Sequence, residues 1–285
     1  MDRIVLVAIL TGLIHLVDTL FYGVRFSGVK TRHLATAYSL YQIISILAMT
    51  ANLVQAPLLS SVVEQAINAG CIAYSAHLNT LRKSIRLIIL AGSGGTALAM
   101  MVTPLFVVLF NRLIFLFEGI GSIPRLICAL FSPARFPKVF HALRSMARAV
   151  LFSGWKFSRI YPQGQLHLRL FIANVAVVAI WTTGVLSALY AAAMLPPYRS
   201  TATLLSGVVN GIAVVLAAIF IDPVIAMITD QAMQGLRSES EFGQLTFLLI
   251  LSRLLGTFFA QLLFLPAASL VKYATMLIVQ ISMLS

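Results

Sequence analysis

Residues 14–59 read IHLVDTLFYGVRFSGVKTRHLATAYSLYQIISILAMTANLVQAPLL, two apolar runs joined by a short basic segment. The first run contains His15 and Asp18, and the second contains Asn52 and Gln55. Polar groups inside hydrocarbon-length segments cost free energy, so they are functional candidates by default. The stretch therefore predicts two membrane helices that carry polar side chains of a functional site.

The composition of the whole chain is that of a membrane protein. Of its 285 residues, 60% are hydrophobic and only 10% are charged, and the mean hydropathy is +0.98. Several runs reach the roughly 20 apolar residues that cross a bilayer. Backbone polar groups in lipid must be satisfied internally, and period-2 patterning is weak, which argues against a β-barrel. We predict an all-α, polytopic membrane protein.

The apolar runs predict about eight transmembrane helices, with six to nine possible, in a single transmembrane domain over residues 1–285. The number depends on whether segments 58–78 and 112–131 each cross the membrane. Prolines in membrane helices indicate breaks only weakly, but they suggest that some helices are discontinuous. Three such prolines interrupt the runs: Pro57, Pro223 and Pro266.

Basic residues give the chain a formal net charge of +12 and gather in three segments, 23–33, 79–86 and 132–167. The positive-inside rule predicts that all three face the cytoplasm, with the N-terminus outside. Attraction to anionic phospholipids is a second explanation, and no nucleic-acid partner is needed. A predicted helix in the central loop places four residues on one face, which suits an anionic surface: Lys138, His141, Arg144 and Arg148.

Deep charges are the strongest candidates for function. His15 and Asp18 share one helix face, where they either hold or relay a proton or form a mutually satisfied structural pair. Glu64, Asp222 and Arg253 are the other charges inside apolar runs. Arg253 needs a counter-charge from one of these carboxylates, or it lines a cavity and meets an anionic group of a substrate.

Two further groups of polar residues flank these charges. The first falls along one face of the second run and predicts either a cavity wall or cross-links between helices: Tyr38, Gln42, Asn52 and Gln55. The second lies at headgroup level, as membrane anchors or as a receiving site for a phosphorylated lipid: Arg25, Lys30 and Arg32.

Enzyme signatures are missing from the sequence. It has no Walker A, HExxH, GxSxG or paired Asp-rich motif, and its eight acidic residues are scattered. Cys71 and Cys128 lie in apolar surroundings without CxxC spacing, and we expect buried thiols. The sequence therefore predicts no cofactor, no metal site and no ATP-driven transport by this chain alone.

The opening stretch resembles the N-terminal signature of the bacterial Amj family of lipid II flippases. The residues that match its form are His15, Asp18, Thr19, Tyr22, Arg25, Gly28, Val29, Arg32, Asn52, Gln55, Ala56 and Pro57. The resemblance implies a transporter rather than an enzyme, located in the bacterial plasma membrane and serving peptidoglycan synthesis, cell-wall biogenesis and cell shape. Its substrate would be undecaprenyl-pyrophosphate-linked disaccharide-pentapeptide, moved from the inner to the outer leaflet.

The resemblance also implies roles for the polar residues. Arg25, Lys30 and Arg32 would receive the pyrophosphate on the cytoplasmic side, and Arg253 would meet it within a cavity. The remaining residues of the expected path are His15, Asp18, Tyr22, Gln42, Asn52, Gln55, Glu64 and Asp222. Two alternatives stay open: an integral-membrane enzyme of polyprenyl-phosphate metabolism, and a scaffold that recruits wall-synthesis proteins. The oligomeric state and the energy source are not visible in the sequence.

Overall fold

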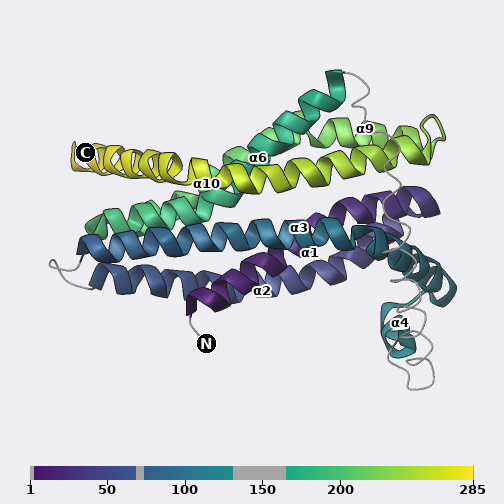
Figure 1. Ribbon diagram of the computed structural model, residues 1–285, viewed down its shortest axis with the longest axis horizontal. Helices are drawn as coiled ribbons and strands as arrows, with labels where there is room; N and C mark the ends of the chain where they lie inside the picture. Colours follow the sequence, from purple (N-terminus) through teal and green to yellow (C-terminus); the bar gives the residue numbers. More distant parts are fainter. Residues whose placement is uncertain (1–2, 69–73, 131–164, 285) are drawn as a thin grey trace.

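The structure, a computed structural model, describes residues 3–68, 74–130 and 165–284, and these residues are almost entirely helical (Figure 1). The N-terminal half contains α1 (Arg3–Thr31), α2 (Leu34–Asn68), α3 (Tyr74–Ile120) and the short α4 (Ile123–Leu130). The C-terminal half contains α6 (Gln165–Met194), a 3₁₀ turn (Pro196–Tyr198), α7 (Arg199–Leu204), α8 (Ser206–Phe220), α9 (Asp222–Met233) and α10 (Glu239–Leu284).

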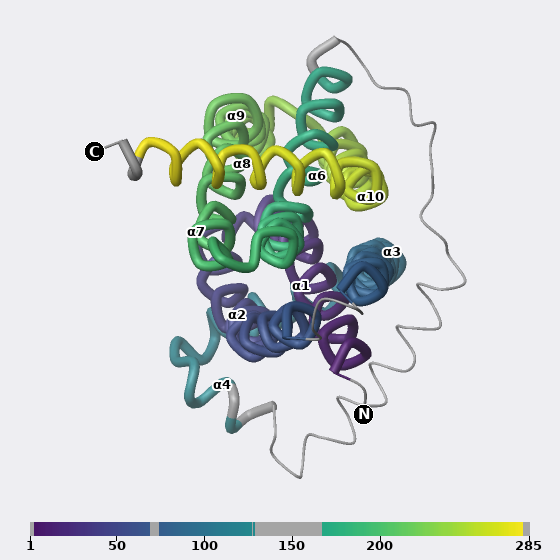
Figure 2. Tube along the Cα trace, turned by 90° about the vertical axis from the view of Figure 1, so that its left-hand side faces the viewer, coloured from purple at the N-terminus to yellow at the C-terminus, as the bar shows by residue number. Residues whose placement is uncertain are grey.

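The helices pack as two halves that meet along α1, α3, α6 and α10. In the first half α1 packs closely on α2 and α3, and in the second α6 packs closely on α8 and α10. The end-on view in Figure 2 shows the two groups one above the other, with α1, α2 and α3 below and α6, α8, α9 and α10 above. A core of buried apolar side chains, among them Val7, Ile85, Leu189 and Phe264, joins the halves near one end of the bundle.

Six helical segments of the described residues are long and apolar enough to cross a membrane. This confirms a polytopic all-α membrane protein, at the lower end of the predicted number rather than at eight. The difference arises because α2 continues without interruption through Pro57 to Asn68, and because α3 includes residues 112–120. A proline removes one backbone donor, and membrane helices tolerate this where neighbouring groups satisfy the freed carbonyl.

The other two prolines behave differently from each other. Pro223 lies in the first turn of α9, where its missing N–H would have no intrahelical partner in any case. Pro266 lies inside α10, which bends there and turns its last part across the end of the bundle (Figure 2). Val271 in that last part packs against Ala191 and Ala202. Only Pro223, therefore, separates two helices.

The continuous α2 also changes the predicted placement of the basic segments. Residues 79–86, near the start of α3, lie at the end of the bundle opposite to residues 23–33 (Figure 1). The expectation that all three basic segments share one side was therefore wrong, because one crossing by α2 separates them. The central loop, including the predicted helix with Lys138, lies outside the described residues except at its C-terminal end.

Small residues let α1 and α3 approach closely. A Cβ atom built on Gly95 would lie 2.0 Å from the carbonyl oxygen of Gly12, and one on Gly92 would lie 2.9 Å from the His15 ring. Close approach of backbones through small residues is a common basis of helix association in lipid. Gly92 and Gly95 therefore serve packing rather than a helix break, since α3 is continuous here.

We expect Gly95→Ala to lower the thermal stability of the detergent-purified protein, because the added methyl group overlaps the backbone of α1. Overpacking of this kind costs roughly 1–3 kcal/mol. Gly94→Ala is the matched control, since a Cβ there meets nothing within 4 Å. Melting measured by size-exclusion chromatography after heating compares the two variants, and equal melting temperatures would contradict the proposed close contact.

Candidate functional site

A stripe of polar side chains runs along one face of α1. Its members are spaced three or four residues apart, so they lie above one another on the helix, and each lines one of two adjoining cavities: Thr11, His15, Asp18, Tyr22 and Arg25. At about 1.5 Å per residue the stripe is roughly 21 Å long, which is about two thirds of the hydrocarbon thickness of a bilayer.

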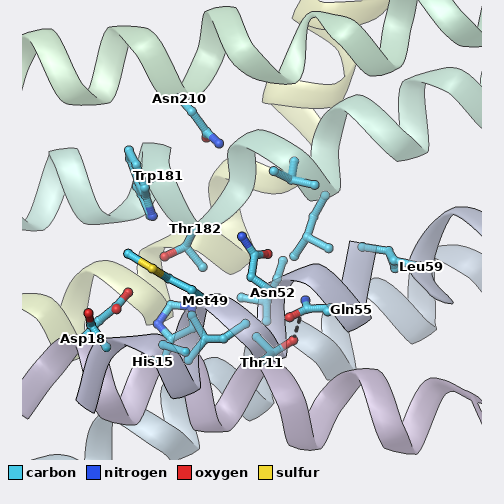
Figure 3. A pocket seen from close by; sticks show the side chains of 16 residues that line it. Thr11, His15, Asp18, Met49, Asn52, Gln55, Leu59, Trp181, Thr182 and Asn210 are labelled. Atoms are coloured by element: carbon cyan, nitrogen blue, oxygen red, sulfur yellow. Dashed lines mark hydrogen bonds between the residues drawn. The ribbon is translucent and has the colours of Figure 1, made fainter. Parts of the chain in front are cut away.

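The first cavity, of about 290 Å³, lies between α1 and α2 on one side and α6 and α8 on the other (Figure 3). Figure 3 shows Asn52 and Asn210 pointing into it from opposite walls. Gln55 donates a hydrogen bond from Nε2 to Thr11 Oγ1 at 2.9 Å. The polar lining is mostly neutral amides and hydroxyls, with Asp18 at its edge.

The second cavity, of about 250 Å³, continues from the first and shares Asp18 and Trp181 with it. Its lining includes three further charged residues, Arg25, Asp222 and Arg253. A largely neutral cavity is thus joined to a charged one at Asp18 and Trp181.

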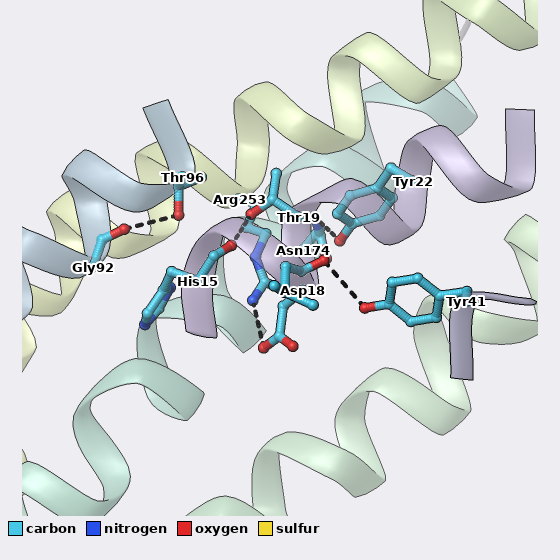
Figure 4. A network of polar contacts seen from close by, with 10 residues as sticks. His15, Asp18, Thr19, Tyr22, Tyr41, Gly92, Thr96, Asn174 and Arg253 are labelled. Atoms are coloured by element: carbon cyan, nitrogen blue, oxygen red, sulfur yellow. Dashed lines mark hydrogen bonds and ion pairs between the residues drawn. The ribbon is translucent and has the colours of Figure 1, made fainter. Parts of the chain in front are cut away.

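An ion pair crosses between the two halves beside this junction (Figure 4). Arg253 Nη2 in α10 lies 3.2 Å from Asp18 Oδ2 in α1, and the side chains are 14% and 38% exposed. Asp18 is therefore the counter-charge that the sequence required for Arg253. Arg253 also lines the second cavity, and its contact with an anionic group of a substrate stays a prediction.

Asn174 joins the same region through several hydrogen bonds. Its Nδ2 donates to Ser252 Oγ at 2.7 Å, and it lies 3.3 Å from the Leu249 carbonyl oxygen and 3.4 Å from the Tyr22 hydroxyl oxygen. Sequence reasoning missed Asn174, although an amide within the apolar run of α6 was a visible signal. It also missed Trp181 and Asn210.

His15 does not form the predicted pair with Asp18. The two side chains share a face of α1, but no hydrogen bond joins them in the described structure. The His15 ring instead packs on Gly92 of α3, and its Nδ1 is buried without a hydrogen-bond partner among the described residues. His15 therefore lines the first cavity and is not a hydrogen-bond partner of the Asp18 carboxylate.

The three basic residues that the sequence predicts at headgroup level do not lie together. Arg25 lines the second cavity and lies 4.8 Å from the centroid of the Phe21 ring. Lys30 is exposed and lies 3.9 Å from Glu239 of α10. Of the three, Arg25 alone lines either of the two cavities described above, so these cavities do not bring the predicted receiving site together.

Arg32 has a structural role at the end of α1. It adopts a left-handed backbone conformation with φ of 62°, and the next amide, of His33, donates to the Gly28 carbonyl at 3.1 Å. This is the pattern of a Schellman cap, in which glycine is the usual residue. The Arg32 guanidinium donates to the carbonyl of Met233, where α9 ends, and so it ties the two halves together.

Three other predicted residues lie at or beyond the edge of this region. Gln42 lines neither cavity, and its backbone carbonyl accepts a hydrogen bond from Ser45 Oγ at 2.8 Å. Glu64 lines a separate cavity of about 330 Å³ with Arg199, near the other end of the bundle. Asp222 is exposed in the first turn of α9, where a carboxylate is favoured by the helix dipole, and it borders the second cavity.

Cysteines and metal ligands add nothing to this site. Cys128 in α4 is exposed, so the expectation of a buried thiol was wrong for it, and Cys71 lies outside the described residues. Within the described ranges no group of three or more His, Cys, Asp or Glu residues is arranged to hold a metal ion.

Comparison with known proteins identifies the family. The family model described as "Amj: Alternate to MurJ" matches residues 10–275. The chain belongs to the Amj family. It is 34% identical over 264 residues to the "Lipid II flippase Amj" of Bacillus subtilis (strain 168), covering 92% of this chain and 93% of that protein. No solved structure matches the chain.

The Amj match confirms the family that the first sixty residues suggested and extends it through the C-terminal half. Both cavities lie wholly within the matched range, including Trp181, Asn210 and Arg253 of the second half. All the residues that line the two cavities therefore lie in the part of the chain that the family model matches.

We expect Asp18→Asn and Arg253→Gln each to lower the melting temperature by several degrees, because each leaves a poorly solvated charge without its partner. Breaking a buried pair costs roughly 3–5 kcal/mol, and the exposure of Asp18 to the cavity reduces this. The double variant removes both charges and should recover part of the loss. Glu239→Gln is the control, because it removes only an exposed pair, worth about 0–1 kcal/mol. Additive losses in the double variant would contradict a direct interaction.

Proposed function

We propose that this protein is a lipid II flippase, which moves undecaprenyl-pyrophosphate-linked disaccharide-pentapeptide across the bacterial plasma membrane for peptidoglycan synthesis. The observation that carries the proposal is the polar stripe of α1, from Thr11 to Arg25, along two adjoining cavities between the halves. A lipid with a large polar head needs such a path through hydrocarbon. Membership of the Amj family and the named function of the Bacillus subtilis relative support the same conclusion.

The second cavity suits the pyrophosphate. Arg25 and Arg253 both line it, and each has a buried Nε without a hydrogen-bond partner among the described residues. Guanidinium groups bind phosphate oxygens through paired, charge-assisted hydrogen bonds. The pyrophosphate would compete with Asp18 for Arg253, so that substrate entry loosens one link between the halves.

Charge favours one orientation of the protein in the membrane. The segment 131–164 carries six basic and no acidic residues, and it connects α4 to α6 at the end of the bundle where Arg25 and Lys30 lie (Figure 1). The positive-inside rule puts this end in the cytoplasm, in contact with anionic phospholipids, and puts both termini outside. Arg25 is then at the cytoplasmic end of the path.

Movement of one half against the other would give alternating access. The halves are linked at the Arg25 end by Lys30 with Glu239, 3.9 Å apart. At the opposite end Gln261 Nε2 donates to the Arg86 carbonyl at 2.8 Å, and the Tyr74 hydroxyl donates to the Ala193 carbonyl. Rocking of two helical units about a central site is a common transport mechanism. Such rocking would break the links at one end of the bundle while those at the other end stay in place.

Transport is tested in cells depleted of their other flippase, where an externally added enzyme cleaves only lipid II that has reached the outer leaflet. We expect the wild-type protein to restore cleavage and Arg25→Ala to reduce the rate at least tenfold at equal expression, because a cavity cation is lost. Arg112→Ala is the matched control, since Arg112 is exposed on α3 and lines neither cavity. No cleavage with well-inserted wild-type protein would overturn the proposed function.

Separation of the halves is tested by a reducible cross-link. In a chain with Cys71→Ser and Cys128→Ser, we expect a short bis-thiol reagent joining Lys30→Cys to Glu239→Cys to stop transport, and reduction to restore it. The control joins Thr36→Cys to Glu118→Cys, whose native side chains bond at 2.7 Å within the N-terminal half. Undiminished transport by the fully cross-linked first pair would show that the halves need not part at this end.

A further inference from the structure

Several side chains that line the first cavity contain buried polar atoms without hydrogen-bond partners in the described part of the chain. Among the described residues, four lining side chains have such atoms: His15 Nδ1, Gln55 Oε1, Thr182 Oγ1 and Asn210 Oδ1. They come from α1, α2, α6 and α8, so all four walls contribute (Figure 3). Such atoms lose free energy unless a bound group satisfies them, and the loss is larger in low-dielectric surroundings.

The chemistry of the lining selects the class of ligand. Amides, a hydroxyl and an imidazole both donate and accept hydrogen bonds, and the lining has no cationic group that would prefer a phosphate. Such a surface suits a ligand with many hydroxyl and amide groups and no charge. N-acetylated sugars have these groups around the whole ring.

Trp181 adds an apolar surface to the same cavity. It lines both cavities at their junction and is 45% exposed, a large exposed fraction for an indole ring at the interior of a bundle. One face of a sugar ring presents C–H groups, which pack on a flat aromatic ring while the hydroxyls at the edge reach the surrounding amides. Trp181 and Asn210 thus provide the apolar and the polar part of a sugar site.

We propose that the first cavity is a glycan subsite, which binds the N-acetylated sugar joined directly to the pyrophosphate. The inference rests on the proposed function and deepens it. Two neighbouring cavities correspond to two neighbouring chemical groups of the substrate, and they meet at Asp18 and Trp181. The first is lined mostly by neutral polar groups, and the second contains both arginines as well as Asp18 and Asp222. The volume of about 290 Å³ is near the lower limit of roughly 300 Å³ for small-molecule sites and suits one sugar ring.

The order of the cavities gives the direction in which the head group lies. The first cavity extends from Asp18 toward Thr11, away from the end of α1 that carries Arg25. In the orientation proposed above, the sugar lies ahead of the pyrophosphate on the way to the outer leaflet. The remaining sugar and the peptide would then lie outside the first cavity, whose lining includes residues of both α2 and α8.

The test is equilibrium binding to the full-length protein in lipid nanodiscs, with lipid II and with undecaprenyl pyrophosphate, which lacks the sugars, as the two probes. We expect lipid II to bind at least tenfold more tightly. Asn210→Leu and Asn52→Leu should each weaken lipid II binding about five- to tenfold, because each removes a contact from the first cavity alone. Both should leave binding of undecaprenyl pyrophosphate unchanged.

Asn79→Leu is the matched control for Asn210→Leu, since Asn79 is an exposed amide of α3 that lines neither cavity. If Asn210→Leu does not fold, Asn210→Ser and Thr182→Val provide the same readout with smaller changes. Equal binding of the two probes by the wild type, or equal weakening of both by the variants, would overturn the glycan subsite and leave the flippase intact. A failure of the proposed flippase function would instead be seen as absence of lipid II cleavage in the cellular assay.

Discussion

The ion pair between Arg253 and Asp18 is the interaction on which the rest of the structure depends. A guanidinium 14% exposed inside an apolar helix must have a counter-charge close by, and the nearest carboxylate belongs to the other half of the molecule. The pair therefore fixes how α1 and α10 face each other. Asp18 also remains 38% exposed and borders both cavities between the halves. Fold and site thus follow from one electrostatic requirement.

Much of the N-terminal wall of the site could be predicted from the sequence, because helical spacing alone puts His15, Asp18 and Arg25 on one face. The groups of the other half that these side chains contact could not be predicted in this way. Arg32 and Lys30 looked equivalent to Arg25 in sequence, yet they contact groups more than 200 residues away, at Met233 and Glu239. Helical periodicity defines the face of the helix on which a residue lies, but not which groups of the protein that face contacts.

The C-terminal wall was harder to predict for a different reason. A single amide such as Asn174 or Asn210 within an apolar run signals either a cavity or a cross-link between helices, and Trp181 is an ordinary residue in a membrane helix. Pro57 was ambiguous in the same way, because lipid-embedded helices accommodate proline. The helix number was overestimated for this reason, whereas the all-α membrane class followed directly from composition.

The small size of the two cavities has a consequence for cell-wall diversity. With about 290 and 250 Å³ they have room for the sugar ring and the pyrophosphate proposed to bind there, but not for the five amino acids attached to the sugar. A carrier of this shape discriminates by the invariant core of its cargo and is insensitive to the side chains of the stem peptide. Bacteria can then alter the amino acids that cross-link their walls without any compensating change in the transporter.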